Sequence, residues 1–486
     1  MSKRLKRQVI RALPWSFAES IVNGFAGLAL TFVLAWFLEP RELGQAAIAL
    51  AVVGVVEIVA GLGMIEAVVG ARSADTRVSD TAFTAVTISS LAAAGLCWGL
   101  AGLVGRLYSD PHIVGLLEVA ALILPVNALA AIPTALLTRK MRAGALTLRM
   151  MTSRVVTVVG IGLLAFFDFG AWAPVVGTLA GSFAAVVVLA LTMSRLPRMR
   201  FSPSEFRNLL AFGAALSIER LMWGSMIRLF WLVIGYVHGT TMLGYFQFAQ
   251  RFIDETATLV QTFSNRFGLS FFAALKRTGR DPNDAYLRAT RLITVAAAPT
   301  FTGLALVMPD LIGTIFDVKW APAVVVAQIT ALGWVIAFPR VLVGPVLRAR
   351  GRQGVLLIYA AVSCSTTLAA GLLTSGQGLI IVALIWISHQ FIGLPWSFYA
   401  LNRYLGITPR RQLTAYTRPL IATALMACTV LGVGVLVQDW APIVRLIALV
   451  AAGTASYFIA IALIDRATLR LGRALLTDLR QIRRAA

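Results

Sequence analysis

Long apolar runs recur along this chain, and they constrain its fold more than any other feature. A helix needs about 20 mainly apolar residues to cross the hydrocarbon of a bilayer, and the runs reach that length. The chain is 59% apolar and only 13% charged, whereas a soluble domain carries about 25% charged residues. We therefore expect an all-α integral membrane protein with about fourteen transmembrane helices.

The first run follows a basic N-terminus and is too long for a signal peptide, whose apolar core has about 7–15 residues. We interpret it as the first spanning helix. The predicted helices cover residues 14–38, 43–63, 82–105, 113–137, 149–167, 172–193, 209–237, 243–272, 288–308, 323–347, 354–373, 377–401, 418–437 and 442–464.

Lysine and arginine set the predicted orientation, because cytoplasmic loops are enriched in them. With the N-terminus inside, the inside loops hold basic clusters at 139–142, 195–200 and 276–280, and the C-terminal tail is also basic. The outside loops hold only Arg41, Arg106 and Lys319. We predict a multi-pass protein with both termini cytoplasmic. A missed or extra pair of helices would preserve this asymmetry, so twelve helices stay an alternative.

The composition argues against several function classes. The net charge of +22 lies in short clusters between apolar runs, so we expect no nucleic-acid partner. The cysteines lie inside apolar runs without a CxxC pair, and the histidines lack zinc-ligand spacing, so we expect no metal. No phosphate-binding GxxxxGK[ST] motif occurs. The short loops leave no room for a catalytic domain, and we predict no catalytic residues.

A weak internal repeat indicates two lobes of six helices around a central cavity, as transporters often have. Glu19 stands 25 residues before Gly44, and Glu219 stands 25 residues before Gly244. Both glycines follow a short outside turn and open the next predicted helix. The predicted parts are an N-lobe (1–193), a cytoplasmic linker (194–208), a C-lobe (209–401), two C-terminal helices (402–465) and a basic tail (466–486).

Charged and polar residues inside the predicted spans mark the candidate site, because a charge near the bilayer centre costs about 2.5–3.5 kcal/mol. One predicted helix, 243–272, carries a polar stripe with spacings of 3 and 4, which is one face of a helix. Such a stripe favours the wall of a water-filled cavity. The candidate residues are Glu19, Asn23, Glu57, Glu219, Arg220, Arg228, Gln247, Arg251, Asp254, Thr258, Gln261 and Asn265.

Each of these residues also has a structural interpretation. Arg251 can pair with Asp254 or Glu255 within one helical turn, and Glu19 with Arg220 can join two helices. Other arginines nearer the cytoplasmic ends can extend to the headgroups; these are Arg154, Arg291 and Arg340. Arginine suits phosphate through its rigid fork of donors, so Arg220, Arg228 and Arg251 favour an anionic substrate. The acids Glu19, Glu57 and Glu219 could take up H⁺ or Na⁺ as a coupling cation.

The order of several loose motifs resembles the bacterial polysaccharide transporters of the multidrug/oligosaccharidyl-lipid/polysaccharide flippase superfamily. They are GLGMIEAVVG (61–70), RLYSDPHIVGLLEVAAL (106–122), PTALLTRKMR (133–142), LPRMRFSPSEFRNLLAFG (196–213), MLGYFQFAQRF (242–252) and IFDVKWAPAVVVAQI (315–329). The resemblance covers nearly the whole chain. In one respect the chain departs from it: Arg228 and Phe230 stand where that family often carries Asn and Asp, which weakens a coupling site there.

The resemblance implies alternating access and an oligosaccharide on an undecaprenyl pyrophosphate carrier as substrate. It also implies a bacterial inner membrane, contact with membrane lipids, and a polysaccharide polymerase and export machinery as partners. A drug or metabolite exporter of the same superfamily is the main alternative, and it would need a cavity dominated by acids. A membrane glycosyltransferase would need a large outside loop, and a scaffold without transport would leave the polar stripe unexplained.

Overall fold

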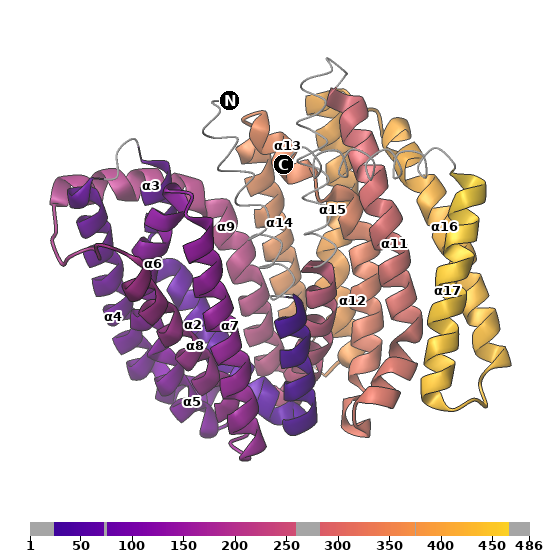
Figure 1. The fold of residues 1–486 in the computed structure, drawn as a ribbon, viewed down its shortest axis with the longest axis horizontal. Coiled ribbons are helices and arrows are strands. Elements are labelled where there is room, and N and C mark those ends of the chain that lie inside the picture. Colours follow the sequence, from indigo (N-terminus) through magenta and orange to yellow (C-terminus); the bar gives the residue numbers. More distant parts are fainter. Residues whose placement is uncertain (1–23, 72–74, 259–281, 375, 466–486) are drawn as a thin grey trace. The chain divides into compact units, whose positions relative to one another are not determined.

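The computed structural model describes residues 24–71, 75–258, 282–374 and 376–465 (Figure 1). Within these ranges every regular element is a helix, and twelve helices are long and apolar enough to cross a membrane. The all-α membrane fold predicted from the apolar runs is thereby confirmed. Two compact units are distinguished, residues 1–255 with 360–382, and residues 256–359 with 383–486. The lobe boundaries predicted from the repeat stay a prediction.

The first unit contains most of the helices before residue 256. They are Gly24–Phe37, α2 (Pro40–Ala60), α3 (Met64–Gly70), α4 (Thr76–Leu107), α5 (His112–Ala121), α6 (Ile123–Arg139), α7 (Ala143–Phe166), α8 (Trp172–Thr192) and α9 (Pro203–His238). A further helix begins at residue 240 and is described to residue 258. Together α5 and α6 form one span, His112–Arg139.

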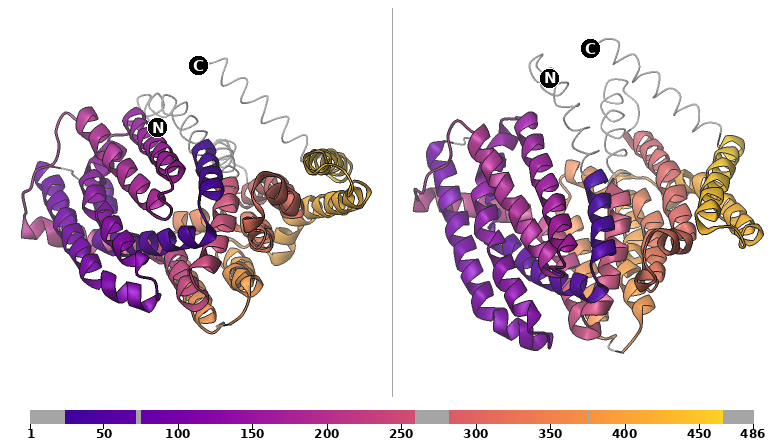
Figure 2. Two further views of the ribbon diagram at one scale, coloured as in Figure 1. Left: turned by 90° about the horizontal axis from the view of Figure 1, so that it is seen from below. Right: turned by 60° about the horizontal axis from the view of Figure 1, so that its bottom comes forward.

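The second unit begins at residue 256, within that helix. Its helices are α11 (Pro282–Ile315), η1 (Val318–Trp320), α12 (Ala323–Ala337), η2 (Phe338–Arg340), α13 (Val343–Ala349), α16 (Pro409–Leu436) and α17 (Pro442–Ile464). Two helices contribute residues to both units, α14 (Gln353–Leu372) and α15 (Leu379–Leu405). The pair α16 and α17 packs side by side and is drawn in yellow in both views of Figure 2.

Each predicted helix in the described chain overlaps an observed one, but the ends differ by up to nine residues, as at the start of α16, which was predicted at residue 418. The helices at 24–37 and 240–258 border residues outside the described ranges, and neither is among the twelve spans. Fourteen spans would require both of these helices to cross the membrane, so the predicted number of fourteen stays a prediction. The predicted single span at 323–347 is correctly placed, but it is interrupted by the 3-10 turn η2.

Small residues let α7 and α8 pack closely. A side chain at Gly177 would meet the backbone of Ile161, and one at Gly181 would meet Thr157 and the Ser153 carbonyl. The Ser153 hydroxyl donates a hydrogen bond of 2.8 Å to the Gly181 carbonyl oxygen. Inside a bilayer, helices associate through such close van der Waals contact and hydrogen bonds, because lipid provides no hydrophobic driving force.

The two glycines of the internal repeat meet in the structure. A Cβ at Gly44 would overlap the carbonyl oxygen of Thr240, and a Cβ at Gly244 would overlap the carbonyl oxygen of Pro40. The contact is therefore reciprocal, with each glycine lying against the residue that opens the other helix. It joins the first turns of α2 and of the helix at 240–258.

Beside this crossing, a buried carboxylate joins α2 to the turn between α4 and α5. Asp110 is 3% exposed, and its Oδ2 accepts hydrogen bonds from Gln45 Nε2 at 2.6 Å and Arg41 Nη2 at 3.1 Å. The backbone N–H of His112 donates to Oδ1. Burial raises the pKa of Asp110, but the hydrogen bonds from Gln45, Arg41 and His112 outweigh it, so the pKa lies below its ordinary value.

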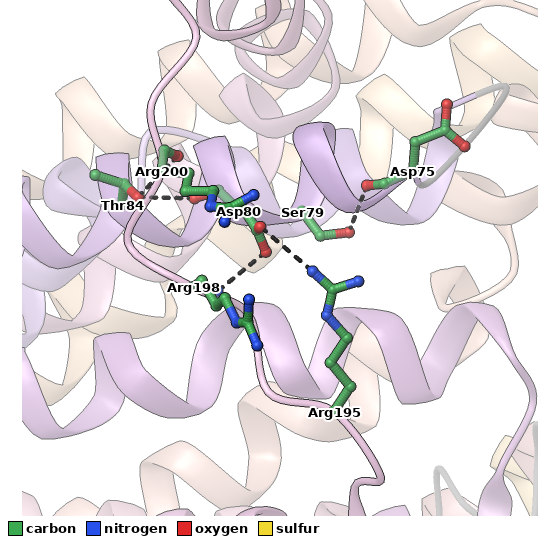
Figure 3. A network of polar contacts seen from close by, with 7 residues as sticks. All are labelled: Asp75, Ser79, Asp80, Thr84, Arg195, Arg198 and Arg200. Carbon is green, nitrogen blue, oxygen red and sulfur yellow. Dashed lines mark hydrogen bonds and ion pairs between the residues drawn. The ribbon is translucent and has the colours of Figure 1, made fainter.

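The linker between α8 and α9, residues 193–202, lies along the first turns of α4 (Figure 3). Asp80, also 3% exposed, accepts the Arg198 backbone N–H at 3.0 Å and pairs with Arg195 Nη2 at 3.7 Å. The Thr84 hydroxyl donates to the Arg200 carbonyl oxygen at 3.0 Å. Three polar side chains one helical turn apart or less thus hold the basic linker in an extended path; they are Asp80, Thr81 and Thr84.

In the second unit, a fully buried carboxylate joins α17 to α11 and α16. Asp465 directly follows α17 and pairs with Arg291 Nε at 2.8 Å and with Arg418 Nη1 at 3.8 Å. Arg291 was expected to extend to the headgroups, but it is held in this ion pair. An apolar cluster of the same three helices packs nearby, including Met426, Val430 and Leu449.

Candidate functional site

Polar side chains inside the spans of the first unit form the candidate site. Glu57 on α2 is half-buried, and its Oε1 accepts a hydrogen bond of 2.7 Å from Asn127 Nδ2 on α6. Asn127 was not among the predicted residues, although it stands alone as a carboxamide in the apolar run 113–137. Its partner lies 70 residues away in the sequence, which no local pattern reveals.

Arg228 on α9 extends across the face of α2. A Cβ at Gly54 would overlap the Arg228 guanidinium, so the missing side chain at position 54 provides its space. Arg228 Nη1 donates to the Gly224 carbonyl oxygen at 2.9 Å. None of the ion pairs between described residues of this unit includes Arg228. Among the described residues, the recorded contacts of the Arg228 guanidinium are therefore with neutral groups.

A second charge group lies where the helix at 240–258 meets α7. Arg154 Nη2 is 3.7 Å from Glu255 Oε1, and Arg251 stands one turn before Glu255 on the same helix. The Glu255 side chain is 17% exposed and occupies the space beside Gly27, where a Cβ would overlap the carboxylate. Two arginines thus accompany one acid, and the Arg154 side chain is paired with Glu255.

The remaining candidates differ in burial, and several lie outside the described residues. Gln247 is buried, Asp254 is half-buried and Thr258 is exposed. Four predicted residues lie outside the described ranges, namely Glu19, Asn23, Gln261 and Asn265. Glu219 and Arg220 lie in α9, and their side chains are outside the described part of the structure. The polar stripe as the wall of a cavity accordingly stays a prediction.

Phe230 stands where the resemblance would place a carboxylate, and it packs in an apolar environment. It is 1% exposed and lies edge-on to Phe246, with ring centroids 5.6 Å apart. A Cβ at Gly371 would lie 3.2 Å from its ring. This position is therefore part of the apolar core of the first unit.

Comparisons with known proteins agree with this architecture. The sequence profile of a family described as polysaccharide biosynthesis protein matches residues 33–325. The succinoglycan biosynthesis transport protein ExoT of Rhizobium meliloti (strain 1021) is 27% identical over 486 residues, covering 96% of this chain and 94% of that protein. The teichuronic acid biosynthesis protein TuaB of Bacillus subtilis (strain 168) is 24% identical over 274 residues, 54% of this chain and 55% of that protein.

Solved transporters share the fold. The lipid II flippase MurJ, in an inward closed conformation, aligns with a TM-score of 0.75 at 15% identity, covering 94% of this chain and 99% of that one. An inward-facing multidrug resistance MATE family transporter of the MOP superfamily aligns with a TM-score of 0.58 at 15% identity, covering 80% and 99%. The resemblance predicted from the order of the sequence motifs is confirmed at the level of family and fold.

Proposed function

Because this chain belongs to the polysaccharide biosynthesis protein family, we propose that it is a flippase for a lipid-linked oligosaccharide. The substrate is a repeat unit on undecaprenyl pyrophosphate, and it moves from the cytoplasmic to the outer leaflet by alternating access. The product serves the synthesis of a surface polysaccharide or exopolysaccharide. The printed names of two relatives, a succinoglycan transport protein and a teichuronic acid biosynthesis protein, support this class of substrate.

The observation that carries the proposal is the position of Arg228. Its guanidinium lies within the membrane spans and is half-buried, and it meets only neutral groups among the described residues. An uncompensated charge there is costly unless water or a ligand meets it. A pyrophosphate would supply the opposite charge, and the planar fork of arginine can bind two of its oxygens at once. Arg251, with Arg154 nearby, gives the substrate a second basic contact.

A drug exporter is less well supported by the same residues. Cationic drugs call for a surplus of acids, but Glu57 is already hydrogen-bonded to Asn127 and Glu255 is accompanied by two arginines. We further propose that the movement is coupled to H⁺ or Na⁺, with Glu57 as the acid to test among the described residues. A Glu57→Gln variant that transports normally, with the same dependence on pH and Na⁺, would exclude that role.

In the proposed setting, the protein resides in the inner membrane of a bacterium with both termini in the cytoplasm. Its partners there are membrane lipids and the polysaccharide polymerase and export machinery. Cysteine accessibility from each side of the membrane tests the orientation. Single cysteines at two exposed positions are expected to react from opposite sides: Arg77 in the first turn of α4, and Trp440 between α16 and α17.

A deletion strain tests the function itself. Polyprenyl-linked oligosaccharides and surface polymer are quantified together, under conditions in which the polymer is made. We expect intact repeat units to accumulate in the cytoplasmic leaflet while surface polymer is lost, and the wild-type gene to reverse both. Normal pools and normal polymer, in a strain without a second flippase, would contradict the proposal.

A further inference from the structure

A helix break in the second unit holds an arginine inside the membrane. The span Ala323–Arg348 is interrupted by η2, which ends at Arg340. Eight residues separate Arg340 from Arg348, which lies at the end of the span predicted to be cytoplasmic, and at the helical rise they cover about 12 Å of the roughly 30 Å hydrocarbon. Interrupted helices at this depth occur in transporters where the backbone lines a binding site.

The Arg340 guanidinium is directed toward α14 and α15. Its Nη1 donates to the Tyr359 hydroxyl at 3.4 Å, its Nη2 donates to Gln390 Oε1, and its Nε donates to the Ile336 carbonyl oxygen at 3.3 Å. A Cβ at Gly393 would overlap both the guanidinium and the Tyr359 hydroxyl, so glycine provides the space. Arg340 was expected to extend to the headgroups, but these contacts hold it in place.

No carboxylate neutralises this charge within the described residues. The ion pairs of the second unit join Arg291, Arg411, Arg418 and Arg445 to aspartates, and none includes Arg340. The three hydrogen bonds use three of the five N–H groups of the guanidinium. Two N–H groups and a full positive charge are thus left for a ligand or water.

Further hydrogen-bonding groups and aromatic rings surround the arginine. The Tyr359 ring stacks on Trp396, with centroids 4.3 Å apart, and Gln390 Nε2 lies 2.9 Å from His389 Nε2. On α11, which packs against η2, the buried hydroxyls of Tyr286 and Thr290 lie one turn apart. Neither hydroxyl bonds to another element of the described chain.

We infer that Arg340, held in position by the Tyr359 and Gln390 oxygens, forms an anion-binding site in the second unit, which takes the phosphate ester of a membrane lipid. The lipid is either a polyprenyl phosphate or a phospholipid, and both present the same phosphate chemistry. The site is separate from Arg228 and Arg251 and does not depend on the flippase proposal, since it can be tested by binding alone.

The test uses the full-length protein in a detergent with a neutral headgroup. Native mass spectrometry measures binding of undecaprenyl phosphate and phosphatidylglycerol, with undecaprenol and diacylglycerol as their uncharged counterparts. We expect a binding event that requires the phosphate, in addition to any event at the substrate site proposed at Arg228. Trp396 stacks on Tyr359, so the same anions should change tryptophan fluorescence in the wild type and have a smaller effect in Trp396→Phe.

Two variants locate this binding event. Arg340→Gln should weaken it about tenfold or more, as expected for the loss of a charge-assisted hydrogen bond. Gln390→Glu supplies an internal counter-charge, so it should also abolish the event while raising the unfolding temperature without lipid. This second variant keeps the test decisive if Arg340→Gln fails to fold. The matched control is Arg350→Gln, an exposed arginine at the cytoplasmic end of the same region, which should bind normally.

The outcomes separate the ligand sources. Stronger binding of undecaprenyl phosphate than of phosphatidylglycerol assigns the site to the polyprenyl carrier, and equal binding assigns it to phospholipid headgroups. Wild-type affinity in both Arg340→Gln and Gln390→Glu would overturn the inference, and so would equal binding of charged and uncharged lipids. In either case Arg340 would be only a structural link between three helices.

Discussion

Gly44 and Gly244, which occupy matching positions of the internal repeat, lie against each other's helix starts in the structure. Each position excludes a side chain because a backbone carbonyl oxygen of the other segment, at Pro40 or Thr240, occupies its place. The repeat visible in the sequence therefore has a physical reason at this point. Two helices can cross at backbone distance only if both lack a side chain there.

Alanine at either glycine should destabilise the protein. Gly44→Ala or Gly244→Ala places a methyl group on a backbone oxygen, and overpacking of this kind costs about 1–3 kcal/mol. Thermal unfolding of the purified protein is the measurement. The matched control is Gly99→Ala in α4, where a Cβ meets nothing within 4 Å. This control should be neutral or slightly stabilising, because alanine favours a helix. A similar loss in all three variants would contradict the explanation.

The rate of trypsin cleavage should show whether the contacts of Asp80 restrain the linker. Asp80→Ala removes the acceptor of the Arg198 N–H, so the linker should detach and be cut faster after Arg198 and Arg200. Asp80→Asn keeps an acceptor and loses only the 3.7 Å pair with the half-exposed Arg195, which is worth little. Asn should therefore resemble the wild type. Equal cleavage rates of the wild type and Asp80→Ala would show that the hydrogen bond to Asp80 does not restrain the linker.

Substitutions at Arg228 separate charge from geometry in transport. Arg228→Gln should abolish complementation of the deletion strain, and Arg228→Lys should restore only part of it, because lysine keeps the charge but not the bidentate fork. Arg207→Gln is the control, since Arg207 is an exposed arginine on the same helix α9. Surface polymer and lipid-linked pools are measured for each, at matched protein levels. Full activity of Arg228→Gln would remove this residue from the substrate site.

Asp110 should make stability depend on pH in the acid range. Its folded pKa is lowered, so its carboxylate contributes stability above the ordinary pKa of about 4, and this contribution is lost as the pH falls through the folded value. We expect the wild type to unfold at a higher temperature than Asp110→Asn at pH 6 and above. The difference should shrink below about pH 4. A difference independent of pH would mean that packing, not charge, makes Asp110 important.

The sequence allowed good prediction of the helices and poor prediction of the contacts between them. Apolar length alone located the spans, since the bilayer imposes one thickness on all of them. It gave no partner for Asn127, because the acceptor Glu57 comes from a helix 70 residues earlier. Arg154 and Arg340 were placed near headgroups on depth alone. The structure pairs Arg154 with a glutamate and gives Arg340 hydrogen bonds to a glutamine and a tyrosine.

Three charged side chains within these spans lie against a glycine of another helix. Such a pair should behave as one unit in evolution. A relative that replaces the glycine with a larger residue has no space for the charged side chain and must lose it as well, whereas a relative that loses only the charge retains an empty space. Co-variation of a glycine with a charge on another helix would thus be a signature of this site in an alignment of the family. The pairs are Gly27 with Glu255, Gly54 with Arg228, and Gly393 with Arg340.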